Sequence, residues 1–327
     1  SERGCGAESG GLALRDAEST VTGLLADADL AMYEAKAGRR GEPLGRDPHR
    51  QRTANERRKL ADDLAVGLHA GEVVAYLQPL VELASNRTVE VEALARWNHP
   101  TLDTLGPMAF LDLAEDAGLD LPLGDAVLRS ACQALQGLPQ PLRLGINLSV
   151  AQLTDRGLAA RIAGILREYS LPPERLVVEI TERDTLARRA GVGRAAPERT
   201  LTELREMGAS LALDDFGTGY SSLTHIRRYT LNSVKIDRTF VAGVCTHPED
   251  RAVVAAVVGM AGALGLQVVA EGVETDEQYD TLRELGCTMA QGFLIAHPMT
   301  AAEMRDWMET RGDDWRHPVA SLARRSQ

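Results

Sequence analysis

Polar side chains recur inside or at the ends of short apolar runs along this chain of 327 residues. These residues are Gln78, Glu92, Asn147, Glu179, Asp214 with Asp215, Lys235, Glu271 and Gln291. Carboxylates and amides with a single lysine form the oxygen-rich type of site that Mg²⁺ or Mn²⁺ selects. Five crowded acidic groups would repel one another, and divalent cations would offset that repulsion. The set therefore predicts a metal-dependent site for an anionic ligand.

Each member taken alone has an ordinary interpretation. A single glutamate at a strand end is usually a solvated charge, and Asn147 in "GINLSV" could satisfy backbone groups in a turn. The repetition of polar residues inside runs such as "VVEIT" and "SVKID" favours a shared function, because chance would not place one in every strand.

Eight predicted strands would position these residues. They are Val73–Gln78, Thr88–Ala95, Leu142–Leu148, Leu176–Thr181, Ser210–Phe216, Ser233–Asp237, Gln267–Glu271 and Thr288–Phe293. From the second strand onward, most gaps can hold a crossover helix, which implies parallel strands. This alternation predicts an α/β fold, a (β/α)₈ TIM barrel with its active site at the C-terminal strand ends. The short connection "VELASNRT" cannot hold a crossover, so the first strand is predicted to run antiparallel to the second.

The doublet in "LALDDFGTGYSSL" poses a geometric problem. Neighbouring side chains of a strand point to opposite faces, so Asp214 and Asp215 could share a site only if the strand ends near Asp214. Gly217 and Gly219 would then free the backbone to turn the Asp215 carboxylate toward the same site.

Composition limits the class of protein. The formal net charge of −11 argues against charge-driven binding to a DNA or RNA polymer or to an anionic membrane. The four cysteines lack CxxC spacing, which is typical of reduced thiols in a cytoplasmic protein. The apolar stretch 252–266 is too short to span a membrane and is predicted to be a buried helix. We therefore expect a soluble, cytoplasmic fragment without membrane contact.

The first 46 residues differ from the rest. "LLADADLAMYEAKAGRRG" has the spacing of an amphipathic helix, which needs a partner to bury its apolar face. This stretch resembles the last helix of the GGDEF (diguanylate cyclase) domain, although the signature loop of that domain is absent. We expect a GGDEF remnant and linker at 1–46, the barrel at 47–318 with helix from about Thr53, and a tail at 319–327. The longer parent protein could be anchored to a membrane by segments upstream of this chain.

Ordered motifs cover roughly residues 56 to 312. They are "YLQPLV", "VEALARW", "GINLSV", "VVEITE", "LALDDFGTGYSSL", "VKIDRTF", "VAEGVET" and "QGFLIAHPM". In this order they resemble the EAL family of cyclic di-GMP phosphodiesterases, which is named for the tripeptide at Glu92–Leu94. The resemblance implies a modified barrel with an antiparallel first strand. It also implies hydrolysis of cyclic di-GMP to linear pGpG with Mg²⁺ or Mn²⁺.

The resemblance also assigns roles by motif position. It implies that two metal ions are bound by Glu92, Asn147, Glu179, Asp214 and Asp215. Lys235 and Glu271 would position and polarise the attacking water. The catalytic residues implied by the resemblance are therefore Lys235, Glu271 and the metal ligand Glu92. The substrate contacts would be Gln78, Leu94, Arg96, Asp237 and Gln291, with Gln291 also supporting the site.

Two of these assignments have alternatives. Asp237 should face the same side of its strand as Lys235, where a structural salt bridge is an alternative to a substrate contact. Glu182 would anchor the glycine loop, and its alternative is an N-cap or surface glutamate.

Three functional hypotheses follow. Every position expected to carry chemistry holds the expected residue type, which favours an active phosphodiesterase. The main alternative is a catalytically inactive cyclic di-GMP receptor, although such domains usually lack a ligand or the glycine loop. A cyclase is nearly excluded for this chain, since it has no GGDEF loop. A homodimer through the region near the Asp215–Ser222 loop is a hypothesis by analogy only.

Overall fold

The computed structural model describes residues 48–316 except 140, 182–194, 218–229 and 312–313. The chain divides into the units Ser1–Arg58 and Lys59–Gln327, and the second unit carries the barrel. The helix expected within 24–41, the anchor Glu182 and most of the glycine loop lie outside the described residues. Helix α2 (Pro48–Ala70) begins before the expected start near Thr53. Proline is tolerated in a first helical turn, where its missing N–H has no helical partner.

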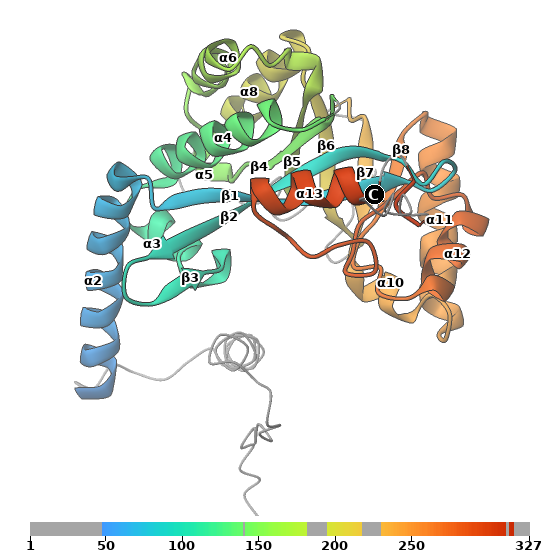
Figure 1. Ribbon diagram of the computed structural model, residues 1–327, viewed down its shortest axis with the longest axis horizontal. Coiled ribbons are helices and arrows are strands. Elements are labelled where there is room, and N and C mark those ends of the chain that lie inside the picture. The colour runs from blue at the N-terminus through green and yellow to red at the C-terminus, as the bar shows by residue number, and fades with distance from the viewer. Residues whose placement is uncertain (1–47, 140, 182–194, 218–229, 312–313, 317–327) are drawn as a thin grey trace, which may run out of the picture. The chain divides into compact units, whose positions relative to one another are not determined.

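Eight strands close into a barrel (Figure 1). They are β1 (Val73–Glu82), β2 (Thr88–His99), β4 (Arg143–Asn147), β5 (Leu176–Thr181), β6 (Ser210–Phe216), β7 (Ser233–Ile236), β8 (Gln267–Ala270) and β9 (Met289–Ala290). The order around the barrel is β1-β9-β8-β7-β6-β5-β4-β2, and pairing of β1 with β2 closes it. Strand β1 is antiparallel to both neighbours, and the other barrel pairs are parallel. The predicted barrel with an antiparallel first strand is confirmed.

The ends of this sheet differ from expectation. Strands β1 and β2 run on past Gln78 and Ala95 because they pair as one long hairpin, to which β3 (Asp103–Leu105) adds a short edge. Strand β9 is much shorter than the expected 288–293. The chain turns at Gly292, where a methyl group would lie 2.1 Å from the Val273 carbonyl oxygen. The Ile295 and Ala296 N–H groups donate to the Gly292 carbonyl, and this turn follows the end of the strand.

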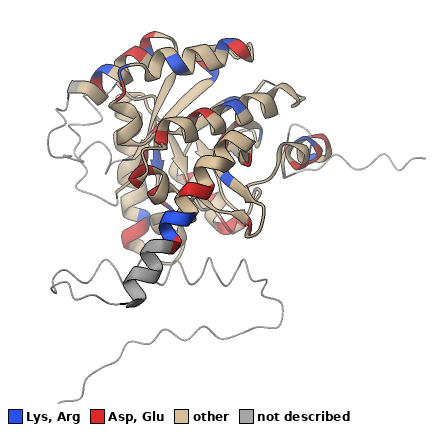
Figure 2. Cartoon of the chain, turned by 90° about the vertical axis from the view of Figure 1, so that its left-hand side faces the viewer, with Lys and Arg blue, Asp and Glu red and all other residues tan. Residues whose placement is uncertain are grey.

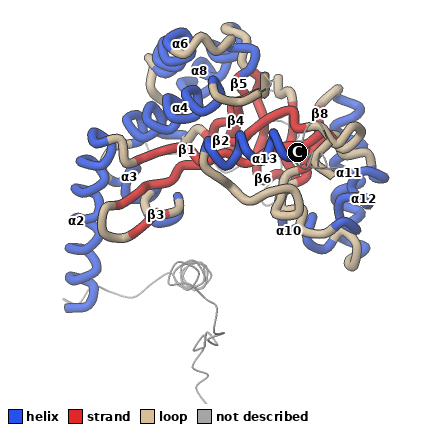
Figure 3. Tube along the Cα trace, viewed as in Figure 1, coloured by secondary structure: helices blue, strands red, loops and turns tan. Residues whose placement is uncertain are grey.

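Helices cover the outside of the barrel (Figure 3). The longer ones are α4 (Asp120–Gln136), α6 (Leu158–Glu168), α8 (Ala195–Glu206), α11 (Pro248–Leu264), α12 (Asp276–Leu285) and α13 (Ala301–Arg311). The shorter ones are η1 (Pro107–Ala109), α3 (Leu111–Asp116), α5 (Val150–Leu153), η2 (Pro173–Arg175) and α10 (Arg238–Gly243). Leucine, valine and isoleucine side chains from both layers form the core between sheet and helices.

The helix expected at 252–266 is present as α11, but it is buried on one face only. Helix α11 buries one stripe, through Val254, Val257 and Ala261, and exposes alanines, glycines and Leu264. Small side chains make the sequence read as apolar all round although only one face packs. In the described part of the chain, no helix combines the length and apolarity needed to span a membrane. Acidic and basic positions are mixed over the helices (Figure 2).

A clasp joins the C-terminal end of the described chain to the barrel. The Trp315 ring packs edge-on against Tyr279 at 5.4 Å, and the Trp315 amide donates to the Asn86 carbonyl at 3.2 Å. The Tyr279 hydroxyl donates to Asn86 Oδ1 at 2.8 Å, and the Arg316 guanidinium lies 4.1 Å from the Tyr279 ring centre. These contacts make Trp315 part of the barrel unit.

Replacing Trp315 with alanine should lower the free energy of unfolding by about 3–5 kcal/mol, because the ring is buried and leaves a cavity. Trp315→Phe is the control: it keeps an aromatic ring at this position and loses the hydrogen bond from Trp315 Nε1 to the Tyr279 hydroxyl, which contributes about 1 kcal/mol. Denaturant unfolding of both variants measures the difference. Equal free energies of unfolding for Trp315→Ala and the wild type would show that the clasp is not part of the cooperative fold.

Candidate active site

Lys235 lies inside the barrel, surrounded by four carboxylates. They are Glu92, Glu179, Asp214 and Glu271. The Lys235 Nζ atom lies 2.6 Å from Glu179 Oε2 and 2.6 Å from Glu271 Oε1. Its distances to Glu92 Oε2 and Asp214 Oδ1 are 3.3 and 3.8 Å. Each group comes from a different strand or its end, so the barrel brings these sequence-predicted residues together.

Two amide side chains bind Glu92 directly, and a third supports one of them. Gln291 Nε2 donates to Glu92 Oε2 at 2.8 Å and to Gln78 Oε1 at 3.0 Å. Asn147 Nδ2 donates to the other oxygen, Glu92 Oε1, at 2.7 Å. Gln78 Nε2 in turn donates to the Ala296 carbonyl at 3.0 Å. This chain of hydrogen bonds fixes the orientation of the Glu92 carboxylate.

The buried lysine stays charged. Burial would lower the pKa of Lys235, but the surrounding carboxylates together hold it well above its usual value. For Glu92, burial would raise the pKa, and Lys235 with the amide donors outweighs that effect and lowers it. A positive charge and at least one carboxylate are therefore fixed side by side.

Other carboxyl groups in the cluster retain protons more readily. Burial, reinforced by the charge of Glu92, raises the pKa of Glu179 well above the usual range. Burial also raises the pKa of Glu271 to about 8, although Lys235 opposes it. The pKa of Asp214 is raised in the same way. Negative charge in this volume needs a cation or protons to balance it.

The two aspartates of the doublet share one side by a route that differs from expectation. Strand β6 continues through both residues to Phe216, with a register break between Leu213 and Phe216. Asp215 itself adopts φ = +54°, in the left-handed region, and its N–H donates to Asp214 Oδ1 at 2.8 Å. The two neighbouring side chains therefore lie on the same side because the strand is irregular and Asp215 has this backbone conformation, and not because the strand ends at Asp214. Gly217 also has positive φ, at +102°, and Gly219 lies beyond the described residues.

The donor set fits a divalent metal ion. One carboxylate oxygen each from Asp214, Asp215 and Glu271 lies within 4.8 Å of the others. In addition, Glu179 Oε1 is buried and has no hydrogen-bond partner within the described structure. A buried unpaired carboxylate oxygen is costly and calls for a positive partner.

The sequence profile of the EAL domain matches residues 61–298. The chain belongs to the EAL family. The cyclic di-GMP phosphodiesterase RocR of Pseudomonas aeruginosa is 42% identical over 252 residues, covering 75% of this chain and 62% of RocR. The same organism's bifunctional diguanylate cyclase/cyclic di-GMP phosphodiesterase MucR is 37% identical over 285 residues, covering 86% of this chain and 41% of MucR. This EAL chain thus spans only part of either relative.

A solved structure repeats the fold of this EAL domain. The complex of the PaMucR phosphodiesterase with c-di-GMP superposes with a TM-score of 0.68 at 38% identity, covering 75% of this chain and 99% of that chain. The shared fold places the cluster around Lys235 inside an EAL barrel.

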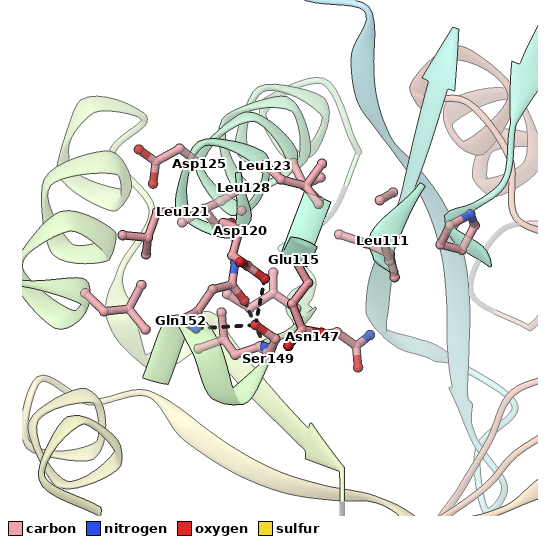
Figure 4. Close-up of a pocket in the computed structure, with 18 of the residues that line it drawn as sticks. Leu111, Glu115, Asp120, Leu121, Leu123, Asp125, Leu128, Asn147, Ser149 and Gln152 are labelled. Carbon is pink, nitrogen blue, oxygen red and sulfur yellow. Dashed lines mark hydrogen bonds between the residues drawn. The ribbon is translucent and has the colours of Figure 1, made fainter. Parts of the chain in front are cut away.

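A pocket of about 420 Å³ opens beside the cluster of the EAL barrel (Figure 4). Its wall is largely aliphatic, with Leu94 and Asn147 among its lining residues. Ser149 Oγ donates to Asp120 Oδ1 at 3.4 Å, and Gln152 Nε2 donates to the Asp120 carbonyl at 2.8 Å. These bonds hold the start of α5 against α4 and so shape the pocket next to Asn147.

The remaining predicted residues of the EAL site differ in placement. Arg96 is half-buried, with its guanidinium 5.6 Å from the Tyr76 ring centre. Asp237 caps α10 by accepting from the Thr239 N–H at 2.9 Å, and among the described residues its carboxylate has this local partner and no salt bridge. Sequence reasoning did not single out Tyr76, whose ring lies beside the Arg96 guanidinium and whose position the alternation with Gln78 in "YLQ" could have indicated.

Binding of Mn²⁺ at pH 7 should release protons, because a divalent charge beside Glu271 favours the ionised form of this carboxyl group, whose pKa is about 8. A raised pKa means that Glu271 is mostly protonated below pH 8 and ionised above it. Metal affinity should therefore increase as the pH rises through about 8. Calorimetry in buffers of different ionisation enthalpy counts the protons.

The Glu271→Gln variant should release fewer protons than the wild type, while exposed Glu249→Gln should match it. Equal release from Glu271→Gln and wild type would exclude Glu271 as the source.

Proposed function

We propose that this EAL domain is a metal-dependent phosphodiesterase that hydrolyses cyclic di-GMP to linear pGpG. The observation that carries the proposal is the buried Lys235 ammonium held among four carboxylates in an EAL barrel. The relatives named as cyclic di-GMP phosphodiesterases and the c-di-GMP complex of PaMucR support the same substrate.

EAL phosphodiesterases are generally divalent-metal dependent, and we propose two Mg²⁺ or Mn²⁺ ions for this chain. The proposed ligands are Glu92, Asn147, Glu179, Asp214 and Asp215. Bound divalent ions lower the pKa of water and stabilise the attacking and leaving oxygens of a phosphodiester. The close approach of Asp214, Asp215 and Glu271 and the unpaired Glu179 oxygen support this assignment.

Lys235 and Glu271 carry the chain's own chemistry. The Lys235 ammonium presents a fixed positive charge beside the position where negative charge develops on the phosphate, and low local dielectric strengthens that effect. The oxygen of water attacks phosphorus, the bond from phosphorus to the 3′ oxygen breaks, and the 3′ oxygen takes up a proton from solvent to leave as a hydroxyl, while the proton lost by the attacking water returns to solvent by way of Glu271. Ionised Glu271, bound to Lys235 through Oε1, accepts the proton of the water. The amides of Gln291 and Gln78 keep Glu92 oriented throughout.

The pocket and the residues around it would hold the nucleotide. The aliphatic wall at Leu94 suits the flat face of a guanine base. Arg96 would contact a phosphate, because its planar fork meets phosphate oxygens in pairs. Asp237 and Gln291 complete the proposed substrate contacts.

A receptor that binds cyclic di-GMP without cleaving it is the second candidate. Incubation of the purified protein with cyclic di-GMP and Mg²⁺ or Mn²⁺ separates the two, with chromatography reporting linear product. Formation of pGpG supports the phosphodiesterase. Binding without product would reject it and favour the receptor.

Lys235→Ala should lower kcat by roughly 10²- to 10⁴-fold, because it removes the fixed charge beside the reacting phosphate. Lys59→Ala is the matched control, since Lys59 is exposed on α2. Initial rates of pGpG formation measure the effect, and circular dichroism verifies the fold of both variants. A folded Lys235→Ala protein with wild-type kcat would remove this residue from the mechanism.

A further inference from the structure

A second buried carboxylate, Glu90, lies two residues before Glu92 on β2. Because side chains alternate along a strand, Glu90 faces the same barrel interior as Glu92. It is only 3% exposed, and none of the roles proposed above uses it. A buried acidic group without a function needs an explanation, since burial of charge is unfavourable.

Arg143 balances Glu90 and crosses the barrel. The two residues are Cα partners between β2 and β4, and Arg143 Nε lies 3.2 Å from Glu90 Oε2. The same guanidinium donates to Gln267 Oε1 on β8 and to Met289 Sδ on β9, both at 3.3 Å. Three strands separate β4 from β8 in the barrel order, so Arg143 spans the interior. This ion pair gives the buried Glu90 carboxyl group a cationic partner of its own.

Gly145 provides the space between the Glu90–Arg143 ion pair and the Glu179–Lys235 ion pair. A methyl group on its Cα would lie 2.6 Å from Glu179 Oε1 and 3.2 Å from Glu90 Oε1. Both carboxyl groups therefore approach the same point, which only a residue without a Cβ leaves open. Gly145 does not have positive φ, so the requirement for glycine here is one of space and not of backbone conformation.

The Glu179 carboxyl group lies between Lys235 on one side and Gly145 with Glu90 on the other. Its Oε2 binds Lys235 at 2.6 Å, while Oε1 faces Gly145 and Glu90. The hydrogen bond that the Lys235 ammonium donates to Oε2 favours this orientation of Glu179. Packing over Gly145 then sets how deep the Glu179 carboxylate lies.

We propose that Gly145, Glu90 and Arg143 are positioning residues that fix the Glu179 carboxylate against Lys235 for the hydrolysis. The inference rests on the proposed function for its kinetic consequence, but the placement of Glu179 can be tested without it. A purely structural ion pair would change stability and leave the position of Glu179 and kcat unchanged.

The first test compares Gly145→Ala with Gly164→Ala, a matched control in α6 with no atom within 4 Å of the added methyl group. Gly145→Ala should lower kcat by at least about tenfold, since misplacement of a catalytic group by 1 Å can cost about 10²-fold. The KM for cyclic di-GMP should stay within about threefold, because the pocket does not contain Gly145. Gly164→Ala should match the wild type. A folded Gly145→Ala protein with wild-type kcat would overturn the proposal.

Glu90→Gln provides an independent arm, because it keeps the shape and removes the charge even if Gly145→Ala does not fold. Like Gly145→Ala, Glu90→Gln should lower kcat and change the KM for cyclic di-GMP much less. In a double variant with Gly145→Ala the losses should be less than multiplicative, since both changes act on Glu179. Wild-type kcat with only an altered melting temperature would show a structural ion pair and overturn the proposal.

Crystal structures of the two alanine variants separate this inference from the proposed function. If the wild type proves inactive, the function fails, but the structures still report the Glu179 Oε2 to Lys235 Nζ contact. That contact should lengthen or break in Gly145→Ala and remain in Gly164→Ala. An unchanged contact would overturn the positioning role whatever the activity.

Discussion

A lysine ammonium buried among carboxylates is the interaction on which the rest of the site depends. Lys235 is 1% exposed, and a lone buried ammonium would lose its proton or unfold its surroundings. Its carboxylate partners come from β2, β5, β6 and the end of β8, elements far apart in the sequence. Only closure of the barrel brings them within reach of one nitrogen. The fold and the charge cluster therefore require each other.

The reversed direction of β1 supports this arrangement. Antiparallel pairing sets Gln78 opposite Glu92, and the short contact of β1 with β9 brings Gln291 to the same place. Gln291 can then donate to both side chains at once. These amides orient Glu92 without adding charge to a volume that already holds an excess of it.

Much of this arrangement could be predicted from sequence because it depends on periodicity and connection length. Alternation of strands and helices indicated the barrel, and the short turn after β1 indicated its reversed strand. Burial of α11 and the length of β9 depend on tertiary packing, such as the contact of Gly292 with Val273, which no local pattern reveals. The positive φ of Asp215 is likewise an exception to the rule for a non-glycine residue. Glu90 was visible in "VEVEAL", but its meaning depends on Arg143 and Gly145 from the next strand.

Charge balance connects the two layers of the barrel interior. One layer of the interior holds the ion pair of Arg143 with Glu90, in which one positive charge balances one carboxyl group, so this pair needs no further cation. The other layer holds the Lys235 ammonium, which faces four carboxylates with Asp215 beside them. Protons can supply part of the difference, which agrees with the raised pKa values of Glu179 and Glu271. Divalent ions would displace those protons and supply the rest. This excess of negative charge thus favours a doubly charged cation over a monovalent one.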